Sequence, residues 1–253
     1  MKFYCNDNKL PRINVVANTA LQEFDISNNL LSALNIRSNT ALTYLNVSNN
    51  AEISMVDVKY NTALEVLIAS GLAITDIDLT SNTSLKGAEL FNINLTATKK
   101  LNKTGLGIVF LEKTPYSEGK MMSVAETRLA WSTERITTNA RNNDDGMANM
   151  NTIKALNSDL SKYPAFKWCA DYGTDWYLPA LNELKVIYEK KSIINSVLSE
   201  YGYKQLQSSS GDYASSTEDD SRDYREAYFE SSSWYQTYTS KSDESQIRAI
   251  FAF

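Results

Sequence analysis

Histidine is absent from this 253-residue chain. Its absence excludes a serine–histidine–aspartate triad and removes the most common general base and the most common zinc ligand. Cysteine occurs only twice, at Cys5 and Cys169, and two thiols so far apart in the sequence do not make a disulfide framework. No apolar run reaches the roughly 20 residues that span a bilayer, and no signal-peptide pattern opens the chain. The sequence therefore predicts neither a histidine-based active site nor a transmembrane segment.

Positive charge is also scarce. The formal net charge is −5, and no run of lysine and arginine stands out that would bind phosphates. We therefore expect no nucleic-acid partner. The composition, 43% apolar and 22% charged, is that of a folded protein, and the length is enough for one large domain or two ordinary ones.

What the sequence does contain is a repeat over its first third. A four-residue pattern recurs in steps of 21 to 22 residues, within the range of leucine-rich repeats: Asn18-Thr19-Ala20-Leu21, Asn39-Thr40-Ala41-Leu42, Asn61-Thr62-Ala63-Leu64 and Asn82-Thr83-Ser84-Leu85. A second asparagine series keeps the same step at Asn8, Asn29 and Asn50, with Gly71 in the next slot. We expect a leucine-rich-repeat solenoid of about four repeats over residues 1–95.

Apolar residues two apart lie between the asparagines, as in short strands with one face inward. They form two sets: Phe3/Cys5, Phe24/Ile26, Leu45/Val47 and Leu67/Ala69; and Ile13/Val15, Leu34/Ile36, Val56/Val58 and Ile77/Leu79. One coil is too small to bury this face alone, so coils stack. At the bends we expect asparagine carboxamides to bond inward-facing N–H and C=O groups, because a carboxamide both donates and accepts. Leu90, Ile93 and Leu95 keep some inward character as the pattern fades.

This region resembles the short, helix-poor leucine-rich repeats of the BspA type on bacterial surface proteins. Phe3 and Cys5 already occupy inward columns, so the first repeat begins within a unit. A solenoid needs a polar cap at a free end. We therefore expect Met1 to begin a fragment of a longer protein, with a signal sequence upstream. The polar residues 96–104 predict a connection to a second domain at 105–253.

The second region predicts mixed α and β structure. Strands are expected at 108–111, at 121–130 and, as a closing strand, at 247–253. The series Met147, Met150, Ile153, Leu156 and Leu160 predicts a helix from Gly146 that Pro164 ends. A second helix is expected at 181–190, and Ser192 is expected to cap a third carrying 193–198. Residues 132–145 are polar and predict a loop.

A proline corner at Trp176-Tyr177-Leu178-Pro179 precedes the 181–190 helix and is by itself typical of a core corner. Four further features complete an ordered set: Asp145-Gly146-Met147-Ala148-Asn149, Trp168-Cys169, Ser215-Ser216-Thr217-Glu218 and Arg248-Ala249-Ile250-Phe251. Together they resemble the FISUMP-type C-type-lectin-like domain, which is related to the variable proteins of diversity-generating retroelements. The resemblance covers roughly 104–253. It implies an α+β fold with a small antiparallel sheet, two to three helices and long loops, whose closing strand pairs with the domain's first strand.

Residues 208–245 combine tyrosine, tryptophan, serine and acidic side chains with almost no aliphatic ones. Aromatic rings flanked by small polar residues are typical of binding loops, because the rings give broad contact area for little entropy. The composition alone fits a solvated hairpin with rings packed on the sheet equally well. The resemblance favours a binding face, because ligand-binding residues of such domains lie in this last segment. We expect Ala227 and Phe229 to be buried and alternate neighbours exposed. The predicted ligand-binding residues are Tyr213, Asp220, Tyr224, Trp234, Tyr235 and Tyr238.

The acidic clusters Asp144-Asp145 and Glu218-Asp219-Asp220 raise the question of calcium. No EF-hand loop and no Glu-Pro-Asn motif is present, so solvated acidic loops are the favoured interpretation. Formylglycine-generating enzymes share the lectin-like fold but use a cysteine pair, whereas this domain has only Cys169, expected to be a buried apolar residue. Paired carboxylates for glycoside cleavage are not excluded in principle, but no motif supports them. We predict no catalytic residue, metal or cofactor.

These observations predict a non-catalytic recognition or adhesion protein at the bacterial cell surface or outside the cell. Its partner would be a protein or glycan on a host or neighbouring cell. The alternative is a structural spacer or assembly subunit that binds through the leucine-rich-repeat face. The ligand itself is not predicted, since fold does not fix function.

Overall fold

The computed structural model describes residues 1–75, 77–90, 107–111, 113–114, 116–200, 202–207 and 211–253. The chain divides into two compact units, Met1–Leu106 and Gly107–Phe253. The predicted connection at 96–104, like Ile93 and Leu95, lies outside the described residues. Within the described parts, no helix has the length and apolar character needed to cross a membrane.

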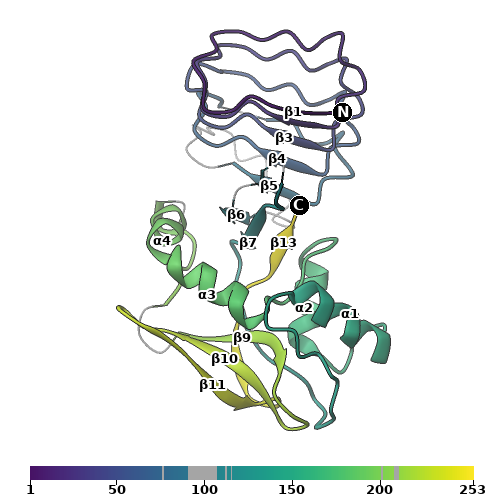
Figure 1. Ribbon diagram of the computed structural model, residues 1–253, viewed down its shortest axis with the longest axis vertical. Coiled ribbons are helices and arrows are strands. Elements are labelled where there is room, and N and C mark those ends of the chain that lie inside the picture. Colours follow the sequence, from purple (N-terminus) through teal and green to yellow (C-terminus); the bar gives the residue numbers. More distant parts are fainter. Residues whose placement is uncertain (76, 91–106, 112, 115, 201, 208–210) are drawn as a thin grey trace. The chain divides into compact units, whose positions relative to one another are not determined.

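The first unit is a solenoid of short parallel strands, stacked in sequence order (Figure 1). The strands are β1 (Lys2–Tyr4), β2 (Glu23–Asp25), β3 (Tyr44–Asn46), β4 (Val66–Ile68) and β5 (Gly87–Glu89). Their register aligns Phe3, Phe24, Leu45, Leu67 and Ala88 in one column. Successive coils therefore advance by 21 or 22 residues, as the asparagine spacing predicts.

Both sets of apolar residues contribute to one core, in which the side chains of Phe24, Ile26, Leu45, Val47 and Leu67 are fully buried. Phe3 is the exception, because it stacks on Phe24 from the first coil and is 39% exposed. The second set packs against the same core but does not form a strand, contrary to its alternating pattern. In these segments the backbone bonds run within a coil: Asn39 N–H donates to the Ile36 carbonyl at 3.0 Å, and Leu42 N–H to the Asn39 carbonyl at 3.1 Å. In each of these bonds an N–H donates to the carbonyl three positions earlier, which is the hydrogen bond of a β-turn. The chain therefore turns here and does not continue as a strand.

The first asparagine series lies inside the bends. Asn61 donates through Nδ2 to the carbonyls of Ile36 at 3.1 Å and Asn39 at 2.8 Å, which belong to the preceding coil. Asn39 and Asn82 make equivalent bonds one coil earlier and later. The Oδ1 atoms of these three residues have no hydrogen-bond partner among the residues that the structure describes. The carboxamides therefore fulfil the donor half of the expected role and not the acceptor half.

The second asparagine series fulfils both halves. Asn50 accepts from the Leu31 N–H at 3.1 Å and donates to the Ile26 carbonyl at 3.0 Å. The assignment of Gly71 to this series is wrong by one position. The step between these two coils is 22 residues, so Gly71 occupies the position in its coil that Asn49 occupies in the preceding coil. Both residues have a left-handed backbone, with φ +67° at Gly71 and +56° at Asn49, because the bend at this position needs it. Leu72 then fills the buried slot that Asn50 occupies one coil earlier.

The second unit contains two sheets. The five-stranded sheet has the order β11 (Trp234–Ser240), β10 (Asp223–Phe229), β9 (Gly211–Glu218), β12 (Glu244–Ile247) and β8 (Thr127–Ala130). The three-stranded sheet has the order β13 (Ile250–Ala252), β7 (Lys120–Ser123) and β6 (Gly107–Leu111). The expected strand at 121–130 is thus two strands in different sheets.

The closing strand at 247–253 is likewise divided, because Arg248 turns its side chain inward between β12 and β13 and is buried. Its second half, β13, pairs antiparallel with β7. The expectation that it pairs with the first strand of the domain is wrong, since β6 lies on the other side of β7.

Four helices are present among the described residues: α1 (Gly146–Leu156), α2 (Pro164–Tyr172), α3 (Leu181–Glu189) and α4 (Lys191–Glu200). Pro164 does not end a helix; it begins α2, because its fixed φ and missing N–H suit a first helical turn. The expected helix from Gly146 stops at Leu156, and Leu160 lies outside it with φ +57°. The helix at 181–190 is confirmed. Ser192 lies within α4 and is not its cap.

The helices anchor the five-stranded sheet. Helices α1 and α3 pack against β9, α3 also against β10, and α2 against β8 (Figure 1). Trp131 packs edge-to-face on Phe166 at 4.9 Å between ring centroids. The proline corner is a core corner as expected, with Trp176 and Tyr177 buried and the Tyr177 N–H and carbonyl both bonded to Ile250.

Candidate functional site

The β10–β11 hairpin carries the exposed rings of the second unit's sheet. All seven residues of β10 pair in unbroken register with β11, and the Glu230 N–H donates to the Ser233 carbonyl at 2.9 Å across the turn. Tyr228 and Tyr235 lie opposite each other, with ring centroids 5.0 Å apart and planes 7° from parallel. Such cross-strand ring pairs stabilise a hairpin and fix its register.

The two faces of the hairpin differ in how deeply their side chains are buried. Ala227 and Phe229 are buried, as predicted, and the Phe229 ring contacts Tyr188 of α3. Their alternate neighbours were expected to be exposed, but Glu226 is buried and Tyr228 is half-buried, so this part of the prediction is wrong. Trp234 lies opposite Phe229 and is half-buried, with the Lys185 ammonium 5.7 Å from its ring centroid. Because side chains alternate along a strand, Tyr235 lies on the opposite face from Trp234, and Tyr238 on the same face as Trp234.

Two of the predicted aromatic site residues are well exposed. The exposed fraction is 45% for Tyr235 and 61% for Tyr238, and Gln236 between them is also exposed. The structure therefore brings Trp234, Tyr235 and Tyr238 together on one strand at the edge of the sheet. They do not share one face.

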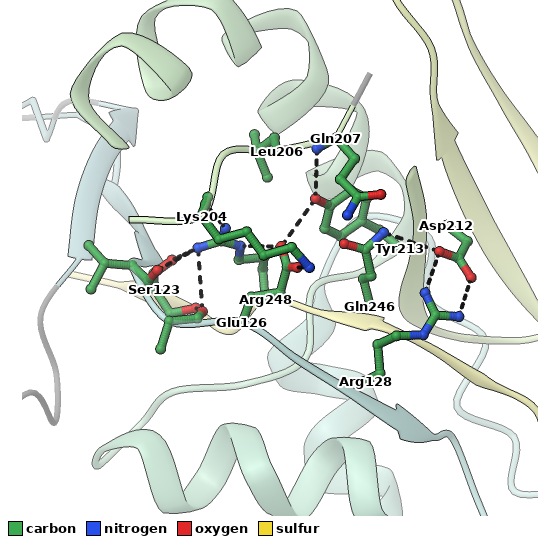
Figure 2. Close-up of polar contacts among 12 residues, drawn as sticks. Ser123, Glu126, Arg128, Lys204, Leu206, Gln207, Asp212, Tyr213, Gln246 and Arg248 are labelled. Carbon is green, nitrogen blue, oxygen red and sulfur yellow. Dashed lines mark hydrogen bonds and ion pairs between the residues drawn. The ribbon is translucent and has the colours of Figure 1, made fainter. Parts of the chain in front are cut away.

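Tyr213 is not part of an exposed surface, and its prediction as a ligand-binding residue is wrong. It lies on β9, between β10 and β12, and is fully buried. Its hydroxyl donates to Glu126 Oε2 at 3.2 Å and accepts from the Gln207 N–H at 3.2 Å (Figure 2). Burial, more than the neighbouring carboxylate, raises the pKa of this hydroxyl well above its ordinary value. Composition does not show that a strand is central, and this is why the prediction failed.

Tyr224 is also buried, and its prediction is wrong for the same kind of reason. Its ring stacks on Trp131 with 6.0 Å between centroids, and its hydroxyl bonds Ser245 Oγ at 2.6 Å. Burial raises the pKa of the hydroxyl, and the adjacent Glu226 carboxylate raises it further. Tyr224 therefore joins the sheet to the aromatic core.

Asp220 is exposed but belongs to the turn between β9 and β10. Its Oδ1 accepts from the Arg222 N–H at 2.6 Å and the Asp223 N–H at 2.9 Å. These two backbone bonds lower the pKa of its carboxyl. Its first role is to close the turn, and it contributes negative charge beside the end of β11.

An ion pair that the sequence did not indicate lies near the hairpin. Arg128 on β8 holds Asp212 on β9 through two bonds, at 2.8 and 2.7 Å, and Gln246 donates to the same carboxylate at 3.1 Å (Figure 2). Burial acts to raise the pKa of Asp212, but the Arg128 and Gln246 bonds outweigh it and the pKa is lowered. The two residues are 84 positions apart in the sequence, so no local sequence pattern predicts that they pair.

Four glutamates with buried carboxylates hold the second unit together, and the sequence marked none of them as buried. Glu126 accepts from Arg248 Nε at 3.0 Å and pairs with Lys204 (Figure 2). Glu183 accepts from the Tyr177 hydroxyl at 3.0 Å and the Ala180 N–H at 2.8 Å. Each of the four carboxylates bonds to several donors, an arrangement that fixes a scaffold.

Glu218 and Glu226 complete this group. Glu218 pairs with Lys241 at 2.6 Å and accepts from the backbone of Thr138 and Asn139, so it is not part of a solvated acidic loop as predicted. Glu226 accepts from Thr239 Oγ1 at 2.6 Å and from Ser245. A buried carboxylate retains its charge only when it is paired or well bonded in this way.

The other acidic cluster serves a helix. Asp145 caps α1 by accepting from the Ala148 N–H at 2.9 Å, and Asp144 accepts from Asn182. No group of three or more histidine, cysteine, aspartate or glutamate side chains suited to a metal ion occurs among the described residues. Cys169 is buried in α2, as predicted, and both cysteines are free thiols.

No protein-family model matches the sequence, and no curated protein matches it. Among solved structures, the functional domain of InlJ from Listeria monocytogenes, which includes a cysteine ladder, has 24% identity and a TM-score of 0.36 over 36% of this chain and 20% of that one. A fimbrial protein from Bacteroides ovatus has 16% identity and a TM-score of 0.45 over 53% of this chain and 36% of that one. This chain therefore spans about a fifth and about a third of these structures. At TM-scores below 0.5 neither resemblance carries a function to it.

Proposed function

We propose that this protein is a non-catalytic recognition or adhesion protein that binds a protein or glycan ligand at the bacterial cell surface. The second unit, proposed to be a C-type-lectin-like domain of the FISUMP type, binds the ligand, and the leucine-rich-repeat solenoid presents it. The observation that carries the proposal is the row of rings on edge strand β11, with Tyr235 and Tyr238 exposed and Trp234 half-buried.

Exposed rings on a rigid element are well suited to binding. Tyrosine and tryptophan bury a large area on contact and lose little side-chain entropy, and they dominate the energetics of many interfaces. Beneath them the hairpin is held in one register by seven residue pairs and by the stacked Tyr228 and Tyr235 rings. A preorganised strand reduces the ordering cost of binding.

The test compares two full-length variants for binding to a glycan array, a panel of extracellular matrix proteins and intact bacterial and epithelial cells. One variant carries Trp234→Ser, Tyr235→Ser and Tyr238→Ser; the other carries Tyr116→Ser, which removes a ring that is 98% exposed elsewhere in the unit. We expect the triple variant to lose binding by at least tenfold while Tyr116→Ser binds as the parent does. Equal binding by the triple variant would instead favour the solenoid face as the binding surface.

A further inference from the structure

Strand β11 leaves half of its backbone unpaired. Two bonds at its ends fix the phase of the ladder: the Glu230 N–H donates to the Ser233 carbonyl at 2.9 Å, and the Lys241 N–H to the Arg222 carbonyl at 2.8 Å. In an antiparallel pair, alternate residues bond to the partner strand and the rest point away. Ser233 and Lys241 are both bonded positions, and every second residue between them is bonded as well. The residues of β11 that bond to β10 are therefore Tyr235, Thr237 and Thr239.

The N–H and C=O groups of Trp234, Gln236 and Tyr238 therefore point outward from the sheet. None of them has a backbone or side-chain partner among the residues that the structure describes. These six donors and acceptors, alternating along the strand, form a template on which another strand pairs.

Other edges in this protein are short or interrupted, and β11 is neither. At the opposite edge of the same sheet, β8 has four residues and includes Arg128. In the three-stranded sheet, β6 has a register irregularity between Val109 and Leu111, and β13 has three residues. By contrast β11 has seven residues, Trp-Tyr-Gln-Thr-Tyr-Thr-Ser, with no charge, no proline and no bulge. It lacks the devices that normally prevent strand addition.

The negative charge near one end of β11 favours a basic partner. Acidic residues gather at its Ser240 end, where Asp223 pairs with Ser240 and the Asp243 N–H bonds the Ser240 carbonyl. Segment 219–225 and residue 243 contain four carboxylates and two arginines, a net charge of −2: Asp219, Asp220, Asp223 and Asp243 against Arg222 and Arg225.

We propose that β11 accepts an extended basic peptide as a sixth strand of the sheet. The proposal rests on the proposed function and names the class of ligand: a protein segment carrying lysine or arginine. The outward backbone groups of Trp234, Gln236 and Tyr238 bond the peptide main chain. Tyr235 on one face and Tyr238 on the other lie beside its alternate side chains. A second copy of this chain is disfavoured as the occupant, because each copy has a net charge of −5 and the two repel.

The experiment measures fluorescence anisotropy of labelled decapeptides titrated with the full-length protein. The probe peptide alternates threonine and lysine. One control peptide alternates threonine and glutamate; another repeats the lysine peptide with every amide N-methylated, which preserves its charge and removes its donors. We expect saturable binding of the lysine peptide and binding at least tenfold weaker for both controls.

A backbone variant tests the same edge from the protein side. Gln236→Pro removes an outward N–H and obstructs the edge, and it leaves the β10–β11 bonds of Tyr235, Thr237 and Thr239 in place, because proline is tolerated where an N–H faces solvent. Gln236→Ala is the matched control. We expect Gln236→Pro to weaken binding of the lysine peptide at least tenfold and Gln236→Ala to change it less than twofold, with unchanged far-ultraviolet circular dichroism.

Each other outcome overturns the proposal. Equal binding of the N-methylated peptide, or unchanged binding of the lysine peptide by Gln236→Pro, rules out strand addition. If the triple ring variant nevertheless loses its ligand, the proposed recognition function stands and only the strand-addition mode is rejected. Equal binding of the glutamate peptide rules out the basic partner, and failure of the lysine peptide to bind rules out the whole proposal. Sedimentation that shows a dimer dissociated by Gln236→Pro assigns the edge to a second copy.

Discussion

The ammonium of Lys241 lies 2.6 Å from Oε1 of Glu218, and both side chains are fully buried. Lys241 also donates to the Ile136 carbonyl at 2.7 Å and lies 4.8 Å from the centroid of the Trp131 ring. The pair therefore joins the end of β9 to the residue that follows β11 and to the loop at 132–145. This loop has no regular structure of its own, and the ion pair holds it against the sheet.

Breaking this pair on one side destabilises the second unit. Lys241→Met leaves the buried Glu218 carboxylate without its buried cation and with only the 3.4 Å contact to the half-exposed Arg141 guanidinium. We expect the free energy of unfolding to fall by about 3 kcal/mol. Urea denaturation followed by tryptophan fluorescence measures this, because all four tryptophans lie in the second unit: Trp131, Trp168, Trp176 and Trp234. The exposed pair Lys167–Asp171 provides the control, since Lys167→Met should change stability by less than about 0.5 kcal/mol. Equal effects of the two substitutions would contradict the assigned role.

Acid should unfold the second unit in part through Glu218. Burial alone would raise the pKa of this carboxyl, but bonds from Lys241 and from the Thr138 and Asn139 N–H groups outweigh it and lower the pKa below its ordinary 4.5. The unfolded chain thus takes up this proton at higher pH than the folded one, so stability present above pH 4.5 is lost as the pH falls through the folded pKa. We expect Glu218→Gln to flatten the fall in unfolding free energy below pH 4.5. Parallel profiles of parent and variant would show that Glu218 does not contribute.

Removing a solenoid carboxamide should loosen the coils on both sides of it. Asn61→Ala removes two hydrogen bonds that join neighbouring coils, those to the carbonyls of Ile36 and Asn39, and leaves each carbonyl only its backbone donor within the coil. At about 1 kcal/mol for each bond, we expect a loss of about 2 kcal/mol. Hydrogen exchange of the backbone amides at 36–64 measures the loss locally, since the first unit contains no tryptophan. Asn35→Ala is the control: Asn35 is exposed and its carbonyl oxygen accepts only a 3.3 Å bond from the Arg37 N–H. Slow exchange retained in Asn61→Ala would show that the ladder is dispensable.

The solenoid was largely predictable because each coil repeats the same local problem. A fixed step of 21 or 22 residues sets the strand register, and burial of two apolar columns sets the inward face. The slot of Gly71 was assigned with a 21-residue step, but the step at this coil is 22 residues, as Asn39 and Asn61 or Leu45 and Leu67 already show in the sequence. The left-handed backbone at Asn49 and Gly71 confirms the corrected alignment.

In the second unit the sequence predicted the helices that begin at Gly146 and Leu181, but it missed α2, merged β7 with β8 and β12 with β13, and did not predict most of the interior. Alternation correctly marked Ala227 and Phe229 as buried, whereas the burial of Tyr213 and Tyr224 depends on strand order and on Trp131, which lies far away in the sequence. The burial of the four glutamates was not predicted either, because it too depends on residues far away in the sequence. Their partners lie up to 122 positions away, as for Arg248 and Glu126, and an isolated glutamate reads as a surface residue.

The two thiols should differ sharply in reactivity. Cys169 is fully buried, and burial raises the pKa of its thiol well above the ordinary value. Cys5 is half-buried, and burial, together with the Asp25 carboxylate, raises the pKa of its thiol to about 11. With a disulfide reagent at pH 8, we expect no reaction of Cys169 in the native protein and reaction of Cys5 about a hundredfold slower than for an unperturbed thiol. Both should react at once in urea, and rapid native labelling of Cys169 would contradict its burial.

Tyr213 and Tyr238 should separate folding from recognition within one sheet. Tyr213→Phe removes the hydroxyl that bonds Glu126 and the Gln207 N–H, so we expect the free energy of unfolding to fall by about 1–2 kcal/mol. Ligand binding should not change, because this side chain does not reach the surface. Tyr238→Ser removes a largely exposed ring, so stability should stay within about 0.5 kcal/mol while binding weakens. Urea denaturation and a binding titration on the same two variants measure both quantities. A loss of binding in Tyr213→Phe at unchanged stability would move the recognition surface away from β11 and into the cluster around Glu126.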